Sequence, residues 1–453
     1  MKYLVNTPCG AVQGTAGRVP GTAAYKGIRY ATAGRWEYPR PVTGWDGVYD
    51  ATAYGNCCYQ PRAFYNEENV PEKAFYYNEF RKGASYTYSE DCLFLNIWTP
   101  DAAKAGDCLP VLVYIHGGGF NGGCGHEKHF DGPVWPTRGI IAVTLNYRLG
   151  PLGFLCLPEL REEAGYTGNY GLSDQLTALQ WVHDNIAAFG GDPGNVTIMG
   201  QSAGAMSVQQ HSLSPLSDGL FHRAVMSSGG GVHKMLSAPQ PDKHFPFWKS
   251  VMDQAGCADL AAFRALPADQ LFAVWQKARK EVKGGGMATS PVQDGRLIVG
   301  TGVELVAAGK QKQIPYMIGS TSEDMMPPIL YKMAKDWCAA QKTPSYAWFF
   351  DRQLPGDKNG AWHSSDLWYW FGTLENGWRP MTNKDHRLSG EMVDYLCSFV
   401  RTGDPNCEGL PVWKPFGNGQ TAALRLGEGR TRMGKPSTLK LIYTMLTNKA
   451  VGE

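Results

Sequence analysis

Two hydrophobic patterns alternate along most of the chain, and together they predict an α/β fold. Short continuous apolar runs predict buried strands, and they cover residues 109–115, 140–145, 195–199, 315–319 and 346–350. Apolar positions three to four apart predict helices at residues 174–189 and 389–401. Buried strands that alternate with helices form mainly parallel sheets covered on both faces. We therefore expect a central, mainly parallel sheet between two layers of helices.

Other segments depart from this alternation. Residues 1–60 show short strands joined by Gly and Pro turns, which predict a small N-terminal antiparallel edge. Residues 61–90 are rich in Tyr, Asn and Glu without any period, and we interpret them as a long surface loop. Residues 231–290 are patterned as helices without a buried strand, which predicts a helical excursion placed to roof a site. Because no repeat or linker interrupts the chain, we expect a single domain over residues 1–453 that contains this excursion, closed by a strand and a helix within 420–447.

Composition narrows the class of protein. The 453 residues are 43% hydrophobic, with a net charge of +2 and no long basic run, so nothing indicates nucleic acid or an anionic membrane as a partner. No stretch approaches the roughly 18 apolar residues of a membrane span, and the first residues lack the apolar core of a signal peptide. The 11 cysteines are scattered without a Cys-x-x-Cys pair. We therefore expect a soluble cytoplasmic protein with reduced thiols and no metal or cofactor.

A candidate nucleophile stands where an apolar strand gives way to a helix. Residues 200–204 read Gly-Gln-Ser-Ala-Gly, after the strand at 195–199 and before a stretch without Gly or Pro at 205–211. Glycine makes up 55 of the 453 residues, so the string alone is weak evidence, and the strand–helix setting gives it weight. Such a turn is too tight for side chains at both glycines and exposes the Ser202 hydroxyl at the head of the sheet.

A glycine-rich stretch follows the buried strand 109–115. Residues 116–120 read His-Gly-Gly-Gly-Phe, so the backbone is free to approach a ligand with its N–H groups. Acyl transfer needs such donors for the oxygen anion of its intermediate, and losing one donor typically costs about 3–4 kcal/mol. The alternatives are a plain glycine turn or a phosphate loop, but no Gly-Lys-Ser/Thr follows. We expect the amides of Gly118, Gly119 and Ala203 to form an oxyanion hole.

The general base is expected among the ten histidines. Where a serine nucleophile stands in such a strand-to-helix turn, the acid and then the histidine follow it along the chain, so the base lies after Ser202. His363 follows the 346–350 strand through a Pro-Gly loop and is the best placed. The histidines that we consider less suitable, because they lie in or beside the next helix, in the excursion or among charged residues, are His211, His222, His233, His244 and His386.

The acid should lie just beyond a strand end, between the serine and the histidine. Glu323 and Asp324 both follow the 315–319 strand, and position alone does not separate them. Asp351 and Asp294 are weaker alternatives. Either carboxylate would fix the tautomer of the imidazole and stabilise its charged form.

Two further groups carry weaker signals. His126 and His129 are three residues apart, but a zinc site needs at least three protein ligands, so we interpret them as part of a solvated rim loop. Aromatic residues are concentrated between 346 and 371, where most would be core. We place Trp362, next to the candidate histidine, and Phe120 in a substrate pocket.

Several of these motifs together resemble the type-B carboxylesterase family of α/β-hydrolases, which includes bacterial nitrobenzyl esterases and the cholinesterases. The resemblance covers nearly the whole chain. It rests on Gly27-Ile28-Arg29-Tyr30-Ala31, Glu90-Asp91-Cys92-Leu93-Phe94-Leu95-Asn96, Gly117-Gly118-Gly119-Phe120, Asn146-Tyr147-Arg148-Leu149-Gly150, Phe189-Gly190-Gly191-Asp192-Pro193 through Gly204, Leu220-Phe221-His222-Arg223-Ala224, Asp294-Gly295, and His363 ahead of Trp370-Phe371-Gly372.

The resemblance implies an α/β-hydrolase fold with Ser202 as nucleophile and His363 as base, and an oxyanion hole of Gly118, Gly119 and Ala203. The family's acid is usually the Glu of a Gly-x-x-x-Asp-Glu-Gly string. Here that string is 319–325, in which the acid position falls on Asp324 and Met stands in place of the last Gly.

Two further expectations come from the resemblance. Cys58 and Cys92 match positions that form a disulfide in secreted relatives, and without a signal peptide we expect them close together but reduced. The chain is shorter than is usual for the family, and part of the shortfall falls in 231–290, which implies a smaller roof and a more open pocket.

We therefore expect a serine carboxylester hydrolase that acts through an acyl-enzyme, with a small-molecule ester as its partner. Aryl or short-chain acyl esters, hydroxycinnamoyl esters among them, are the expected substrates. The same catalytic residues would serve an amidase or a lactonase. A non-catalytic binding protein is the alternative from another class, but such relatives typically lose the nucleophile. The sequence leaves the oligomeric state open.

Overall fold

A computed structural model describes residues 2–417, 419–427 and 429–447. An 11-stranded sheet runs through its centre in the order β18-β17-β16-β15-β14-β13-β11-β12-β10-β4-β3. Its strands are β3 (Thr15–Ala16), β4 (Thr22–Arg29), β10 (Phe94–Pro100), β11 (Leu109–Ile115), β12 (Ile141–Leu145), β13 (Gly191–Gln201), β14 (Arg223–Ser227), β15 (Tyr316–Thr321), β16 (Ser345–Phe350), β17 (Ala423–Leu426) and β18 (Arg432–Gly434). The strands from β12 to β17 pair in parallel, and those at both edges are antiparallel, which confirms the predicted mainly parallel sheet.

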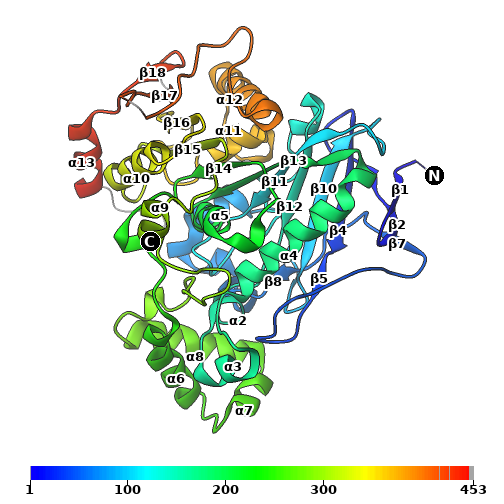
Figure 1. Ribbon diagram of the computed structural model, residues 1–453, viewed down its shortest axis with the longest axis vertical. Helices are drawn as coiled ribbons and strands as arrows, with labels where there is room; N and C mark the ends of the chain where they lie inside the picture. The colour runs from blue at the N-terminus through cyan, green and yellow to red at the C-terminus, as the bar shows by residue number, and fades with distance from the viewer. Residues whose placement is uncertain (1, 418, 428, 448–453) are drawn as a thin grey trace.

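The helices surround this sheet, with the N-terminal strands gathered at one end (Figure 1). They are α1 (Ala74–Phe80), α2 (Gly150–Phe154), α3 (Pro158–Ala164), α4 (Tyr170–Asn185), α5 (Ala203–Leu213), α6 (Phe245–Gln254), α7 (Leu260–Ala265), α8 (Ala268–Glu281), α9 (Gly302–Ala307), α10 (Pro327–Ala339), α11 (Leu367–Phe371), α12 (Asn383–Thr402) and α13 (Thr438–Thr447). The smaller sheets pair β1 (Leu4–Thr7), β2 (Gly10–Gln13) and β7 (Val48–Asp50), then β5 (Ala31–Thr32) with β6 (Arg40–Pro41), and β8 (Cys57–Cys58) with β9 (Tyr88–Ser89).

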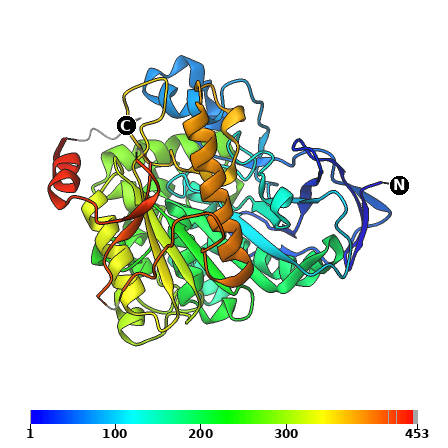
Figure 2. The same cartoon turned by 90° about the horizontal axis from the view of Figure 1, so that it is seen from above.

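Strand β11 shows how the sheet separates two hydrophobic cores. Successive side chains of a strand point to opposite faces, so alternate residues enter different cores. Val111 and Val113 pack in one core with residues of α4 and α5, whereas Leu112 and Tyr114 pack in the other with residues of α11 and α12. Figure 2 shows α12 lying across its face of the sheet. Because both faces are covered, the strands are apolar without interruption, as the sequence indicated.

The helical excursion has a core of its own. Helices α6, α7 and α8 occupy most of residues 245–281, and no strand lies among the described residues of 231–290. Trp248, Phe263 and Trp275 are buried in a third cluster, together with residues of α2 and α3. These helices gather at one end of the molecule (Figure 1).

The structure corrects the interpretation of residues 61–90 as a surface loop. The segment contains three 3-10 turns (Pro61–Phe64, Glu67–Asn69 and Pro71–Lys73), helix α1 and strand β9. Several of its charged residues are buried in ion pairs. Arg81 Nε lies 2.7 Å from Glu67 Oε2, and Glu79 Oε1 lies 2.6 Å from Nη2 of Arg379, far along the chain. In the sequence, charged residues that form buried ion pairs cannot be distinguished from those of a solvated loop, which is why the prediction failed.

The expectation of reduced thiols at Cys58 and Cys92 is also wrong, because the structure joins them in a disulfide. The bond connects β8 to the segment just before β10 and closes a loop over a sequence separation of 34 residues. Over the described residues, every helix is too short or too polar to cross a membrane.

Candidate active site

The strand-to-helix turn at Ser202 has the geometry that its sequence predicts. Strand β13 ends at Gln201 and helix α5 begins at Ala203, which leaves Ser202 between them with φ 56° and ψ −124°. A Cβ at Gly200 would lie 2.3 Å from the backbone of Gly204, and one at Gly204 would lie 2.1 Å from the carbonyl oxygen of Ile115. Both positions therefore require glycine, and the strained serine backbone directs its side chain away from both elements.

The glycine-rich stretch after β11 folds back on itself beside the turn. The carbonyl of Gly118 accepts from the N–H groups of Asn121 (3.0 Å) and Gly122 (3.1 Å). Gly118 and Gly119 have positive φ angles of 107° and 61° and are exposed, and in the described part of the chain their own amides donate to no backbone carbonyl. Ala203 opens helix α5, and an amide at a helix start has no partner within the helix.

His363 and Asp324 are in direct contact. His363 Nδ1 lies 2.7 Å from Asp324 Oδ1, and the Asp324 side chain is only 1% exposed. The N–H of Met325 donates to the same carboxylate at 2.8 Å, and the hydroxyl of Thr321 donates at 3.1 Å. These donors fix the orientation of the carboxylate, which in turn holds the imidazole at its Nδ1 edge.

This contact shifts the pKa values of both Asp324 and His363. Burial alone would raise the pKa of Asp324, but the charge and hydrogen bond of His363 and further donors outweigh it and lower that pKa. Burial likewise works against a charged His363, yet its pKa is raised because the carboxylates of Asp324 and Asp366 favour the imidazolium. The site therefore favours the charged histidine that forms when a base accepts a proton.

Glu323, the equal candidate for the acid, faces elsewhere. Its backbone pairs with that of Trp362, and its carboxylate accepts from the N–H of Ala361 at 2.9 Å. The pairing of Glu323 with Trp362 places the next residues, Asp324 and His363, side by side. Adjacent side chains on an extended segment point in opposite directions, so only one of the two acids reaches the histidine.

Two neighbours of the histidine were missed by sequence analysis. The side-chain nitrogen of Gln201 lies 3.2 Å from Nε2 of His363, the ring nitrogen opposite Asp324. Asp366 is buried, accepts from Ser227 Oγ (2.8 Å) and Trp370 Nε1 (3.1 Å), and has its pKa raised to about 6 by burial and by the charge of Asp324. Gln201 occupies a variable position of the Gly-x-Ser-x-Gly string, and Asp366 belongs to no motif that we could recognise, although both lie within three positions of a residue that we had chosen.

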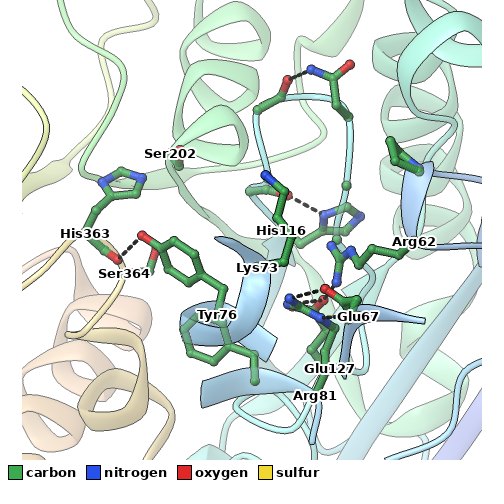
Figure 3. A pocket seen from close by; sticks show the side chains of 18 of the residues that line it. Arg62, Glu67, Lys73, Tyr76, Arg81, His116, Glu127, Ser202, His363 and Ser364 are labelled. Atoms are coloured by element: carbon green, nitrogen blue, oxygen red, sulfur yellow. Dashed lines mark hydrogen bonds and ion pairs between the residues drawn. The ribbon is translucent and has the colours of Figure 1, made fainter. Parts of the chain in front are cut away.

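A cavity of about 1170 Å³ brings these groups together. Its wall includes Ser202, His363 and residues 117–119, and Figure 3 shows the imidazole pointing toward Ser202. The remaining lining includes many residues of the 61–81 segment, together with Gln276, Arg279 and Lys280 of α8. The excursion thus supplies one part of the wall, next to the segment that we had interpreted as a loop.

The two residues predicted for the substrate pocket differ in position. Trp362 lines the cavity and packs edge-on against Phe75, with ring centroids 5.0 Å apart. Phe120 does not appear in the cavity wall among the described residues; it is buried against Phe154 with ring centroids 4.9 Å apart. The positive φ of Phe120, 61°, follows directly on that of Gly119 and turns the ring under the glycine-rich stretch.

The interpretation of residues 126–129 as a solvated rim loop is wrong. His126, Glu127 and His129 are all buried. Arg62 donates to Glu127 at 2.6 Å in the cavity wall, and this guanidinium helps to lower the pKa of Glu127 to about 2 against the effect of burial (Figure 3). His129 stacks on Phe80, and burial lowers its pKa to about 3, so it is neutral.

The sheet, the strained serine at the end of β13 and the histidine–carboxylate pair define an α/β-hydrolase. Comparison with known proteins identifies the family. The Carboxylesterase family matches residues 2–336 and 330–441, and the chain belongs to that family. It is a carboxylesterase, an enzyme that hydrolyses carboxylic esters.

Its relatives agree with this assignment. The chain is 31% identical to para-nitrobenzyl esterase of Bacillus subtilis, over 90% of this chain and 91% of that protein. It is 34% identical to fumonisin B1 esterase of Sphingopyxis macrogoltabida, over 71% of this chain and 56% of that protein. Among solved structures, a thermophilic PNB esterase superposes with a TM-score of 0.83 at 27% identity, covering 98% of this chain and 100% of the other. The fold and the activity predicted from sequence are confirmed.

Proposed function

We propose that Ser202, His363 and Asp324 form the catalytic triad of this esterase. Ser202 attacks the ester carbonyl while His363 takes its proton, and Asp324 orients the imidazole and stabilises its charge. The oxyanion that forms accepts hydrogen bonds from the amides of Gly118, Gly119 and Ala203. His363 then protonates the departing alcohol, and water repeats the sequence on the acyl-enzyme.

One observation carries this proposal: the 2.7 Å contact of His363 with Asp324 beside the cavity that Ser202 and the glycine-rich stretch also line. The amides of that stretch support it, because they are exposed and donate to no backbone carbonyl in the described part of the chain. The same three residues would attack an amide or a lactone, so the leaving group is decided by the rest of the cavity.

The cavity wall favours aryl or short-chain acyl esters of small carboxylic acids, with hydroxycinnamoyl esters among them. Its aromatic residues near the histidine are Tyr76, Phe80, Phe130 and Trp362. Aromatic side chains offer large apolar contact area and stack on rings. The name of one relative, para-nitrobenzyl esterase, agrees with an aryl ester as substrate.

The test is the hydrolysis of a short nitrophenyl ester by the wild type, by Ser202→Ala and by Ser212→Ala. Ser212 lies on α5, which follows Ser202, and its hydroxyl donates to the carbonyl of Val208 on that helix, so it provides a matched control. We expect Ser202→Ala to lose about three orders of magnitude or more in kcat, and Ser212→Ala to retain most activity. A folded Ser202→Ala variant with near wild-type turnover would refute the assignment. Matched nitroanilide and lactone substrates distinguish an esterase from an amidase or lactonase.

The cytoplasmic location stays a prediction. The Cys58–Cys92 disulfide bears against it, because thiols in the cytoplasm are usually kept reduced. Cell fractionation followed by a count of free thiols in the recovered protein decides between the two locations.

A further inference from the structure

Three buried side chains that take no part in the ester chemistry converge beneath the glycine-rich stretch. Cys57 lies on β8, whereas Cys124 and His126 lie just after that stretch. Their ligand atoms all lie within 4.8 Å of one another, and Cys57 Sγ is 3.5 Å from His126 Nε2. Cys57 is 1%, Cys124 2% and His126 8% exposed, and none of the three lines the cavity.

We propose that Cys57, Cys124 and His126 bind one Zn²⁺ ion. Zinc binds thiolate sulfur at about 2.3 Å and imidazole nitrogen at about 2.0–2.1 Å, so two such ligands on a tetrahedral ion lie about 3.5 Å apart. The separation of Cys57 Sγ and His126 Nε2 matches this value without any movement. A set of two soft thiolates and one imidazole binds zinc in preference to calcium or magnesium.

The charges of such a site balance. Two thiolates offset the two positive charges of the ion, and the histidine binds as a neutral imidazole, so the buried complex carries no net charge. Each thiol releases its proton on binding.

The ligands are held in place by their neighbours. The ring of Tyr54 stacks on His126 with centroids 4.4 Å apart and planes 7° apart, and the Tyr54 hydroxyl donates to Asp131. Stacking of this kind limits rotation of the imidazole ring. Cys57 is fixed from the other side, because the adjacent Cys58 is bonded to Cys92.

The site connects two segments that a pair of hydrogen bonds already joins. The side chain of Gln60, just beyond β8, accepts from the N–H of Gly123 at 2.9 Å and donates to its carbonyl at 3.1 Å. Cys124 is the next residue, so the ion would fasten β8 to the end of the glycine-rich stretch a second time. Since the ester does not reach these ligands, the role of the ion is structural.

The sequence concealed this cluster because Cys57 and His126 are 69 residues apart. The pattern that we tested, His126 with His129, contains only one of the three ligands. His129 is buried among aromatic rings instead.

The test uses the full-length protein, treated with a chelator and reduced with a phosphine in the absence of oxygen. Zn²⁺ is added, the excess is removed by gel filtration, and metal per chain is measured by mass spectrometry; Co²⁺ in place of zinc reports thiolate ligation and tetrahedral geometry through its absorption spectrum. Wild type is compared with Cys57→Ser, Cys124→Ser and His126→Gln. Cys397→Ser is the matched control, since Cys397 is a buried free cysteine in α12.

We expect one zinc per chain in the wild type and in Cys397→Ser, with sulfur-to-cobalt charge-transfer bands in both, and loss of retained metal in the three ligand variants. Zinc should also raise the melting temperature of the wild type and leave that of Cys124→Ser unchanged. Because three different ligand variants are compared, a folding failure in one leaves two others to decide.

Three outcomes would overturn the proposal. A reduced wild type that retains no zinc would leave a thiol–imidazole hydrogen bond as the role of the cluster. Equal retention in wild type and all three folded ligand variants would place the metal elsewhere. A Cys57–Cys124 disulfide in the purified protein, together with no zinc uptake after reduction, would assign the pair a redox role instead.

Discussion

Asp324 and Glu323 are adjacent carboxylates with different partners, so a matched pair of amides separates their roles. Asp324→Asn keeps the size of the side chain but removes the charge that stabilises the imidazolium, and we expect kcat/KM to fall by about 10³- to 10⁴-fold. Glu323→Gln removes a carboxylate that accepts from Ala361 rather than from His363 and should cost much less. Steady-state kinetics on a nitrophenyl ester measures both. A larger loss in Glu323→Gln would reverse the assignment of the acid.

The pH dependence of kcat/KM reports the titration of His363. The base must be neutral, so activity falls as the pH drops through its pKa, which lies above the usual 6.5. Asp366 favours the imidazolium, and with its own pKa at about 6 it is charged over most of this range. Asp366→Asn should therefore lower the pKa of His363 and move the acidic limb to lower pH. An unmoved limb in a folded variant would show that Asp366 has no electrostatic effect on the base.

The position of an individual residue could be predicted from the sequence where a motif determines the local backbone geometry. Ser202 stands in a turn that only two flanking glycines permit, so its position could be predicted. Position along the chain did not separate Glu323 from Asp324, because the choice depends on which way one residue of an extended segment points. Only the family resemblance indicated Asp324. Gln201 and Asp366 contact His363 or its surroundings only through the fold, and no local pattern indicated them.

Among the structural elements, the glycine-rich stretch contains a position without room for a side chain. Gly118 has φ 107°, and an added Cβ would lie 2.1 Å from the carbonyl oxygen of Gly122. Gly118→Ala should displace an oxyanion donor and lower kcat by about 10²- to 10³-fold with a smaller effect on KM. Gly286→Ala is the control, since a Cβ there meets nothing within 4 Å. Similar kcat values for the two variants would argue against Gly118 as a donor.

Helix α8 contributes a cation to the cavity. Arg279 lies over the ring of Trp275 at 4.8 Å, its buried Nε has no hydrogen-bond partner in the described part of the chain, and burial lowers its pKa. We expect esters that carry a carboxylate to bind through it, so that Arg279→Gln raises KM about tenfold for such an ester and little for a neutral one. Lys277→Gln, exposed on the same helix, is the control. Equal KM changes for both esters would exclude this contact.

Residues 61–90 illustrate where element prediction from sequence stops. The segment reads as polar and aperiodic, yet it packs on the site because its charges find partners far along the chain, as Glu79 does with Arg379. Helix α1 has only seven residues, too few to show a helical period. The length of an element and the distance to its partners thus decided what the sequence could reveal.

For the molecule as a whole, the sheet was the most predictable feature. Strands covered on both faces are continuously apolar, and β11 was predicted with its observed bounds, Leu109–Ile115. The disulfide state of Cys58 and Cys92 was predicted wrongly, since we relied on the first residues of the chain rather than on the distance between the two sulfurs.

The separate core of α6, α7 and α8 divides the molecule into regions that need not open together. Native-state hydrogen exchange should therefore show the amides of these helices exchanging as a cooperative group, at a lower free energy than those of β11 and β13. Exchange of both regions at the same free energy would contradict this. Helix α8 carries part of the cavity wall, while Ser202 and His363 belong to the sheet region. Such an opening would therefore admit a bulky ester and leave the relative positions of the two reacting side chains unchanged.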